Sequence, residues 1–198
     1  MIKRIVLTGG PCAGKTSAIK IIRDYFEKKD YIVLNIDECA TKIINQGISP
    51  YGKNKIDMYE FQKYVFKMQI EEEKKIEDFI VNNKNKNIIV LYDRCLIDNK
   101  SYVSDEEYNK LLNEFNIDIK EYISKFDLFI HLVTAAVDTD YYTLANNNAR
   151  VETKEDAILL DEKIMKCYKN IPNHKIADNR SNFNDKVNYI IKLIEELL

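Results

Sequence analysis

Residues 9–16 read Gly-Gly-Pro-Cys-Ala-Gly-Lys-Thr and match the phosphate-binding loop (P-loop) pattern Gly-x-x-x-x-Gly-Lys-Thr in full. The strand-like run Ile2–Leu7 stands directly before this loop, and a helical pattern stands directly after it. A P-loop needs that context, because a strand must deliver it and a helix must leave it for its backbone N–H groups to surround a phosphate. The arrangement therefore predicts an α/β fold that binds a nucleoside triphosphate.

The residue types in the loop have separate tasks. Glycines let the backbone close tightly, Lys15 reaches the β- and γ-phosphates, and the Thr16 hydroxyl is a ligand for Mg²⁺. We therefore expect ATP or GTP together with Mg²⁺ as cofactors. The residues expected to contact the nucleotide here are Gly9, Gly10, Pro11, Cys12, Ala13, Gly14, Lys15, Thr16 and Ser17.

Composition predicts a single compact P-loop domain over residues 1–198. The chain is 45% hydrophobic, and its 30 basic and 32 acidic residues leave a net charge of −2. That balance argues against nucleic-acid binding through bulk charge. No apolar run reaches the roughly 20 residues that span a bilayer, and the first expected strand starts at the amino terminus with no signal segment before it. We expect a cytoplasmic monomer or homodimer without stable membrane insertion.

Strand and helix patterns alternate along the chain. The expected strands are Ile2–Leu7, Tyr31–Ile36, Ile88–Tyr92, Asp127–Val133 and Lys175–Ala177. The expected helices are Ala13–Lys28, Cys39–Asn45, a long helix from Met58 to Phe79, Lys154–Lys169 and Phe183–Leu198. This order predicts a P-loop three-layer sandwich with about five parallel strands and helices on both faces.

Ligands of such a sheet bind outside the carboxyl ends of its strands. Asp93 and Arg94 follow the apolar run Ile88–Tyr92, so Asp93 is a candidate Mg²⁺ ligand and Arg94 a candidate substrate or phosphate ligand. Helix capping is the alternative role for Asp93. Asp37 and Glu38 end the second strand, where a carboxylate could accept the proton of a substrate hydroxyl. For Asp37, helix capping and a catalytic role are equally good interpretations. Glu38 is therefore the better catalytic candidate.

The arginines are informative because the chain has 25 lysines and only five arginines. Arg150 falls in an expected lid-like segment around residues 138–153, where it could close over the transferring phosphoryl group. A solvated surface arginine is the alternative. Asn179, within Asp178-Asn179-Arg180 after the last expected strand, is a candidate contact for the nucleotide base.

Other residues resemble functional motifs but are better interpreted as structural or as chance matches. Residues 54–57 read Asn-Lys-Ile-Asp, the guanine signature of small GTPases, but they precede the Asp93 strand instead of following a later one, and we interpret them as chance. His131 lies in an expected buried strand and is more typical of a hydrogen-bonded core histidine. The four cysteines lack metal-site spacing. Three of them, Cys12, Cys39 and Cys95, either fill space or ring the active site.

Several blocks together resemble the NadR / TRPL-translocation-defect type of P-loop domain, which is AAA-like. The blocks are Gly-Gly-Pro-x-Ala-Gly-Lys-Thr, Tyr-Asp-Arg-x-x-x-Asp, His-Leu-Val-Thr-Ala-Ala, Tyr-Thr-Leu-x-Asn-Asn-x-Ala-Arg-x-Glu and the stretch from Asp178 to Lys186. Relatives of this type are built like nucleoside and nucleotide kinases. One branch phosphorylates ribosylnicotinamide, and another is a GTP- and phosphoinositide-binding regulatory protein.

The resemblance implies roles for individual residues. Lys15 and Thr16 would be the nucleotide and Mg²⁺ ligands, Glu38 the glutamate after the second strand, Asp93-Arg94 the kinase-like pair, and Arg150 the lid arginine. The leading hypothesis is transfer of the γ-phosphate of ATP or GTP to a hydroxyl of a nucleoside-like acceptor.

Two residues at the start of the long helix bear on the acceptor. Phe61 and Gln62 are candidates to contact its base, with core packing as the equal alternative for Phe61. Two other functions compete with the kinase hypothesis: a nucleotide-binding regulatory protein with little catalysis, linked to phosphoinositides in one form, and a lipid- or partner-binding protein that retains the fold.

Overall fold

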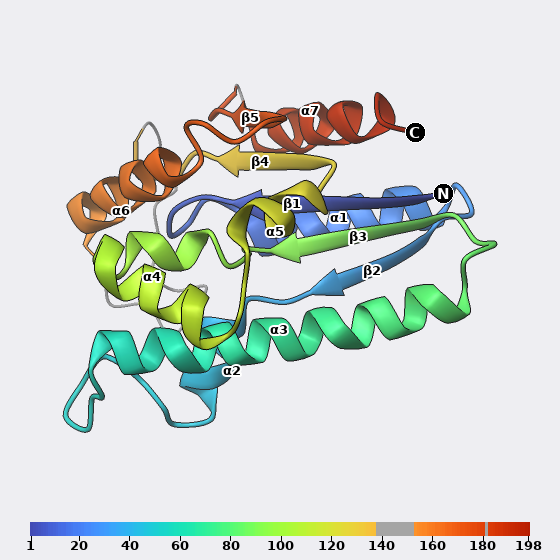
Figure 1. Cartoon of the computed structure of the whole chain (residues 1–198). Helices are drawn as coiled ribbons and strands as arrows, with labels where there is room; N and C mark the ends of the chain where they lie inside the picture. The colour runs from blue at the N-terminus through green and yellow to red at the C-terminus, as the bar shows by residue number, and fades with distance from the viewer. Residues whose placement is uncertain (138–152, 181) are drawn as a thin grey trace.

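The computed structural model describes residues 1–137, 153–180 and 182–198. Its centre is a five-stranded, all-parallel sheet in the order β2-β3-β1-β4-β5 (Figure 1). The strands are β1 (Ile2–Thr8), β2 (Ile32–Ile36), β3 (Ile88–Asp93), β4 (Leu128–Leu132) and β5 (His174–Ala177). The predicted parallel sheet is therefore confirmed, and each strand lies within two residues of its expected bounds at either end.

The expected helices are also present. They are α1 (Lys15–Glu27), α2 (Cys39–Asn45), α3 (Met58–Asn82), α6 (Lys154–Cys167) and α7 (Phe183–Glu195). The first helix begins two residues later than predicted, because Ala13 and Gly14 still belong to the P-loop. Three elements were not predicted: the short 3₁₀ turn η1 (Asp98–Ser101) and the helices α4 (Asp105–Glu114) and α5 (Ile119–Ser124).

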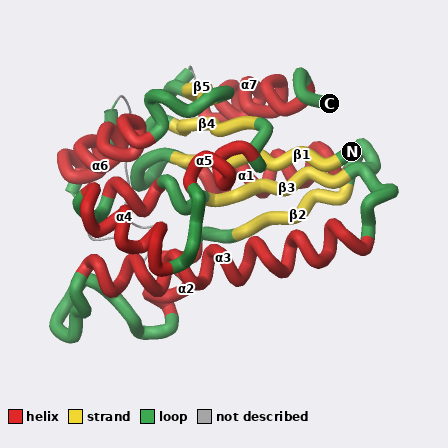
Figure 2. The backbone as a smooth tube through the Cα atoms, viewed as in Figure 1, coloured by secondary structure: helices red, strands yellow, loops and turns green. Residues whose placement is uncertain are grey.

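Helices cover both faces of the sheet, as predicted for a three-layer sandwich (Figures 1 and 2). Side chains alternate along each strand, so Ile89 and Leu91 of β3 pack towards α1 and α7, while Ile88 and Val90 pack towards α3 to α6. Both faces of β3 are buried, which explains its unbroken apolar run.

The same alternation places the polar residues at the carboxyl edge of the sheet. Asp93 follows Ile89 and Leu91 in register and so lies on the α1 side, level with Leu7 of β1. The P-loop leaves β1 at this edge and leads into α1. A strand end, a loop and a helix start therefore meet at one place, as the P-loop pattern required.

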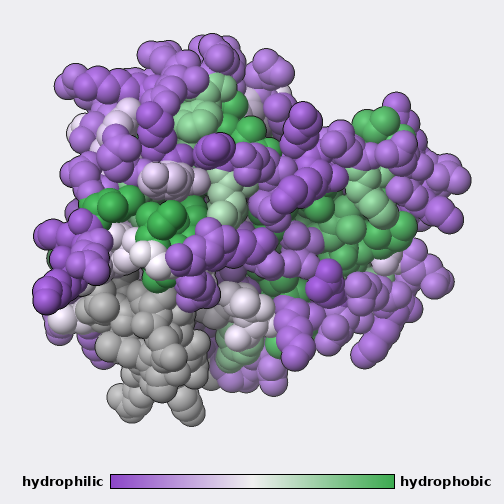
Figure 3. Space-filling model, turned by 90° about the horizontal axis from the view of Figure 1, so that it is seen from below, coloured by the Kyte–Doolittle hydropathy of each residue, from purple (hydrophilic) through white to green (hydrophobic). Residues whose placement is uncertain are grey.

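The outer surface is mostly hydrophilic. On the lower side of the molecule, which carries α2 and α3, hydrophobic groups appear between hydrophilic ones (Figure 3). Asp57 caps α3 by accepting a hydrogen bond from the Tyr59 N–H at 2.8 Å, which supports a structural role for residues 54–57. No helix in the described part of the chain is both long and apolar enough to cross a membrane.

Candidate nucleotide and acceptor site

The P-loop backbone requires glycine at its two ends. Gly9 has φ 134°, and a Cβ there would overlap the carbonyl oxygen of Leu132 in the neighbouring strand β4. Gly14 has φ 84° and lies against the Phe183 ring, with no space for a Cβ. Other residues rarely adopt these conformations, so the glycines let the loop form close to both neighbours.

Two side chains from the start of α1 anchor the loop to its surroundings. Lys15 is buried, and its Nζ donates to the carbonyl oxygens of Gly9 and Gly10 at 3.1 and 3.2 Å. The Thr16 hydroxyl donates to Asp93 Oδ2 at 3.0 Å. The predicted nucleotide and Mg²⁺ residues therefore lie side by side at the end of β3.

Asp93 carries an unusual carboxylate. Its side chain is 3% exposed, and Oδ1 has no hydrogen-bond partner among the described residues. Burial raises the pKa of Asp93 to about 6 despite the opposing charge of Lys15. A buried carboxylate oxygen with no partner, next to a hydroxyl, fits Mg²⁺, which binds proteins through one or two oxygens and takes the rest from phosphate and water. The described residues hold no cluster of three acidic, histidine or cysteine ligands for a metal.

Glu38 and Arg94 form a second charged group beside the P-loop. Arg94 Nε donates to Glu38 Oε1 at 2.7 Å, and the Thr41 hydroxyl donates to Oε2 at 2.7 Å. Burial alone would raise the pKa of Glu38, but the charges of Arg94 and Lys15 lower it to about 2. Glu38 is therefore ionised at neutral pH.

Asp37 is not part of this group. Its carboxylate accepts a hydrogen bond from the Asn35 side chain and pairs with Lys42, and its side chain is 61% exposed. Asp37 does not cap α2, because Glu38 occupies the N-cap position and makes no side-chain cap bond. The capping alternative for Asp37 is therefore wrong. Asp93 likewise bonds the Thr16 hydroxyl of α1 instead of capping the segment that follows it.

A small pocket with a cavity volume of about 90 Å³, which we call the acceptor pocket, opens between the P-loop, α2 and α3. Its lining includes Pro11, Glu38, Phe61, Gln62, Arg94 and Tyr102. Gln62 is buried, and its Oε1 accepts a hydrogen bond from Asn99 Nδ2 at 2.7 Å. The mixture of aromatic and polar groups in its lining is typical of ligand pockets.

A second pocket of about 450 Å³ lies on the other side of the P-loop, beside Gly14 and Ser17. Asn179 lines it, as predicted for a base contact, but its side chain is already engaged. Its Nδ2 donates to the Thr134 carbonyl at 2.8 Å, and its Oδ1 accepts from Lys186 Nζ at 3.0 Å. Phe183, which lies against Gly14, is the aromatic side chain that reaches this pocket.

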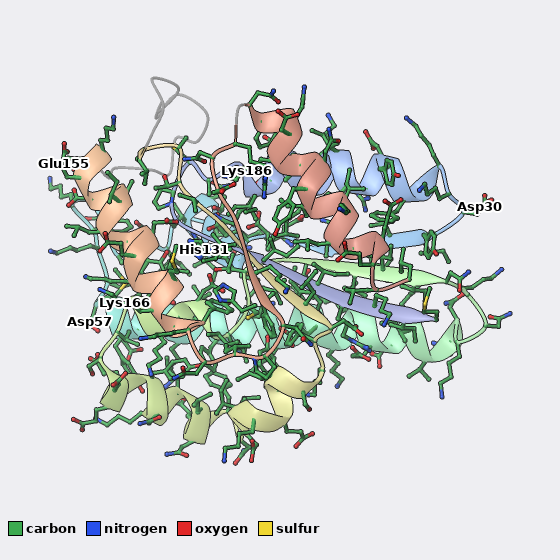
Figure 4. All side chains as sticks on the ribbon, turned by 90° about the horizontal axis from the view of Figure 1, so that it is seen from above. Asp30, Asp57, His131, Glu155, Lys166 and Lys186 are labelled. Carbon is green, nitrogen blue, oxygen red and sulfur yellow. The ribbon has the colours of Figure 1, made fainter. Side chains whose placement is uncertain are left out.

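His131 is a buried core residue, as predicted. Its Nε2 lies 3.1 Å from Asp161 Oδ1, and the same oxygen accepts the Gly10 N–H of the P-loop at 2.5 Å. Figure 4 shows His131 in the interior, whereas Asp57 and Glu155 lie at the edge of the molecule. Asp161 was missed from the sequence, because it sits in α6, 151 positions from Gly10.

The predictions for Arg150, the lid and the cysteines concern different parts of the chain. Arg150 and most of the expected lid, residues 138–152, lie outside the described residues. Cys39 and Cys95 are buried and line the acceptor pocket, and Cys12 lines the second pocket, so these thiols both fill space and surround the site. Asp98 is the last residue of the Tyr-Asp-Arg-x-x-x-Asp block, but no role was predicted for it; it is 2% exposed and lies 3.1 Å from Arg94 Nη1.

Comparisons with known proteins agree with this geometry. The AAA domain family (AAA_28) matches residues 4–186. A thymidylate kinase from Ehrlichia chaffeensis superimposes with a TM-score of 0.63 at 14% identity, covering 100% of this chain and 99% of that one. A thymidylate kinase from Candida albicans gives 0.59 at 15% identity, covering 98% and 91%. No curated protein matches the sequence significantly. At these identities the likeness shows the fold, which is that of P-loop kinases.

Proposed function

Because the chain belongs to the AAA domain family of P-loop proteins, we propose that it transfers the γ-phosphate of ATP or GTP to a hydroxyl of a small nucleoside-like acceptor. One observation carries the proposal. Glu38 and Arg94 line a pocket that the P-loop also lines through Pro11, and the charge of Lys15 acts on Glu38. A protein that only binds nucleotide has no need of an ionised carboxylate and an arginine that face the acceptor pocket.

The donor half of the site is the P-loop. Lys15 Nζ now donates hydrogen bonds to two carbonyl oxygens of the loop, and phosphate oxygens would replace these acceptors when nucleotide binds. Each hydrogen bond would become stronger, because the new acceptors are charged. Thr16 and Asp93 would hold Mg²⁺, which when bound neutralises charge on the phosphate oxygens. We also propose that Arg150, which lies outside the described residues, adds positive charge from a lid.

The acceptor half of the site is the acceptor pocket. Ionised Glu38 can accept a hydrogen bond from a hydroxyl and orient its oxygen towards the γ-phosphate. Its low pKa is compatible with this role, because the loose transition state of phosphoryl transfer depends on positioning and charge more than on early proton removal. Phe61 and Gln62 line this pocket, and we propose that they contact the base of the acceptor. Phe61 also packs in the hydrophobic core, which was the alternative role for it.

Charge in the acceptor pocket favours an uncharged acceptor over one that already carries a phosphate. Among the described lining residues, Arg94 is the one cation, and two carboxylates, Glu38 and Asp98, already bind it. A phosphate on the acceptor would meet that net negative charge, whereas a hydroxyl would find a hydrogen-bond acceptor.

A panel of nucleosides and their monophosphates tests the proposal. The protein is incubated with Mg²⁺ and either ATP or GTP, and the products are identified by mass spectrometry. We expect one or more nucleosides to gain a phosphate with stoichiometric ADP or GDP, and the monophosphates to react less. Tight nucleotide binding without acceptor-dependent product would instead support the regulatory function and reject the kinase.

A further inference from the structure

Asp98 is a buried carboxylate that accepts four hydrogen bonds from separate parts of the chain. Oδ1 accepts from the Thr8 hydroxyl at 2.5 Å and from Arg94 Nη1 at 3.1 Å. Oδ2 accepts from the Cys95 N–H at 3.0 Å and from the Tyr168 hydroxyl at 2.5 Å. A buried charge is retained only when its lone pairs are satisfied in this way, and such a network holds its members in one geometry.

Arg94 is held in place from two sides. Its Nε bonds Glu38 Oε1 at 2.7 Å, and its Nη1 bonds Asp98 Oδ1 at 3.1 Å. A guanidinium is planar, so fixing two of its nitrogens fixes the direction of the whole group. Its backbone has φ 74°, a conformation that residues other than glycine rarely adopt and that persists where neighbouring contacts impose it.

We propose that Asp98 is a positioning residue that aims the Arg94 guanidinium into the acceptor pocket for phosphoryl transfer, an inference that rests on the proposed function. Glu38 alone holds one nitrogen and would let the guanidinium turn about that bond. The second carboxylate stops this rotation. It also shares the charge of Arg94, so Glu38 is less neutralised and keeps an oxygen lone pair for the acceptor hydroxyl.

The same carboxylate connects the two halves of the site. Thr8 is the last residue of β1 and directly precedes the P-loop, and Tyr168 caps the carboxyl end of α6. Asp98 therefore fixes Arg94 relative to the strand that delivers the P-loop. An arginine held to that strand keeps its distance from the bound γ-phosphate constant.

Double-mutant kinetics test the proposal directly. Asp98→Asn keeps the shape of the side chain and removes its charge. We expect kcat for the best nucleoside of the panel to fall roughly ten- to a hundredfold, the scale of a misplaced catalytic group, with the Kd of a fluorescent ATP analogue unchanged within about twofold. In an Arg94→Ala background, Asp98→Asn should have no further effect on kcat, because the group it positions is gone. An equal loss in both backgrounds would overturn the proposal.

Tyr168→Phe is the matched control. It removes a hydrogen bond to the same carboxylate but on Oδ2, away from Arg94. We expect a lower melting temperature with kcat within about twofold of the unmodified protein. If Asp98→Asn does not fold, Arg94→Lys serves instead, because one ammonium group cannot replace the planar fork that spans both carboxylates. An unchanged kcat in Arg94→Lys would contradict the proposal that Glu38 and Asp98 together fix the guanidinium.

Nitrogen-15 NMR of the arginine side chains provides a readout without substrate. Slow rotation of the Arg94 guanidinium is expected in the unmodified protein and in Tyr168→Phe, and fast rotation in Asp98→Asn. A guanidinium that stays rigid in Asp98→Asn would reject the inference. If the unmodified protein phosphorylates no member of the panel, the proposed function fails on its own, and the NMR result separates that failure from this one.

Discussion

At the scale of single residues, the charge of Lys15 influences both carboxylates of the candidate site. It lowers the pKa of Glu38 and opposes the burial that raises the pKa of Asp93. Glu38 belongs to the acceptor pocket and Asp93 to the predicted Mg²⁺ position, so one ammonium group lies between the two halves. Its interactions with the Gly9 and Gly10 carbonyls keep it there without nucleotide.

Lys15→Ala should therefore weaken nucleotide binding. The change removes charge-assisted hydrogen bonds, which contribute about 1.5–3 kcal/mol each, so we expect the Kd of ATP or GTP to rise at least about tenfold. Isothermal titration calorimetry measures the change. Lys20→Ala, on the exposed face of α1, is the control and should leave the Kd unaltered. Equal Kd values for Lys15→Ala and the unmodified protein would remove Lys15 from the nucleotide site.

At the scale of elements, α4 and α5 both begin at residues whose side chains cap the helix. Hydrophobic periodicity alone did not predict these two helices. Ser104 and Glu107 form a capping box at the start of α4, and Asp118 caps α5 by accepting from Lys120 and Glu121. α5 is too short to show a period, and α4 buries only three apolar residues at helical spacing. Capping residues are therefore the sequence signal that could have located them.

Ser104→Ala tests this explanation of α4. Loss of the cap hydrogen bond to the Glu107 N–H should lower the free energy of unfolding by about 1 kcal/mol without changing nucleotide affinity. Urea unfolding measures the effect. Ser124→Ala, which loses only a bond to the Glu121 carbonyl within α5, should change stability less. A larger loss in Ser124→Ala would contradict the role of the capping box.

Sequence patterns predicted the five strands and the helices α1, α2, α3, α6 and α7 because β-rich runs and helical stripes repeat with a clear period. They also predicted Lys15, Thr16, Glu38, Asp93 and Arg94 at the sheet edge, and the structure brings these residues together. The roles of Asp98 and Asp161 were not predicted, for a physical reason. Their partners Thr8 and Gly10 lie 90 and 151 positions away, and only the folded chain brings them within hydrogen-bond distance.

At the scale of the whole molecule, Asp161 connects helix α6, which covers one face of the sheet, to the P-loop. It projects from α6, accepts the Gly10 N–H, and pairs with His131 of β4. Burial alone would raise the pKa of Asp161, but its hydrogen bonds with His131 and with the Gly10 N–H lower it. A carboxyl group with a lowered pKa in the folded state contributes stability at pH values above its unfolded pKa, near 3.9. That contribution is lost as the pH falls through the folded pKa.

Asp161→Asn should therefore destabilise the protein most near neutral pH. Charge-assisted hydrogen bonds suggest a difference of roughly 1.5–3 kcal/mol at pH 7. Urea unfolding of both proteins between pH 3 and 7 should show this difference shrinking towards the acid end, where Asp161 becomes protonated. A difference that grows on acidification would show that the sign of the pKa shift is wrong.

If the P-loop and the Glu38–Arg94 pair form one phosphoryl-transfer site, Glu38→Gln will impair transfer without impairing nucleotide binding. Gln keeps the size of the side chain but removes the charge that orients the acceptor hydroxyl. Single-turnover transfer of the γ-phosphate to the best nucleoside is measured together with the Kd of the nucleotide. We predict an unchanged Kd and a transfer rate at least about a hundredfold lower. Transfer at the unmodified rate would contradict the account.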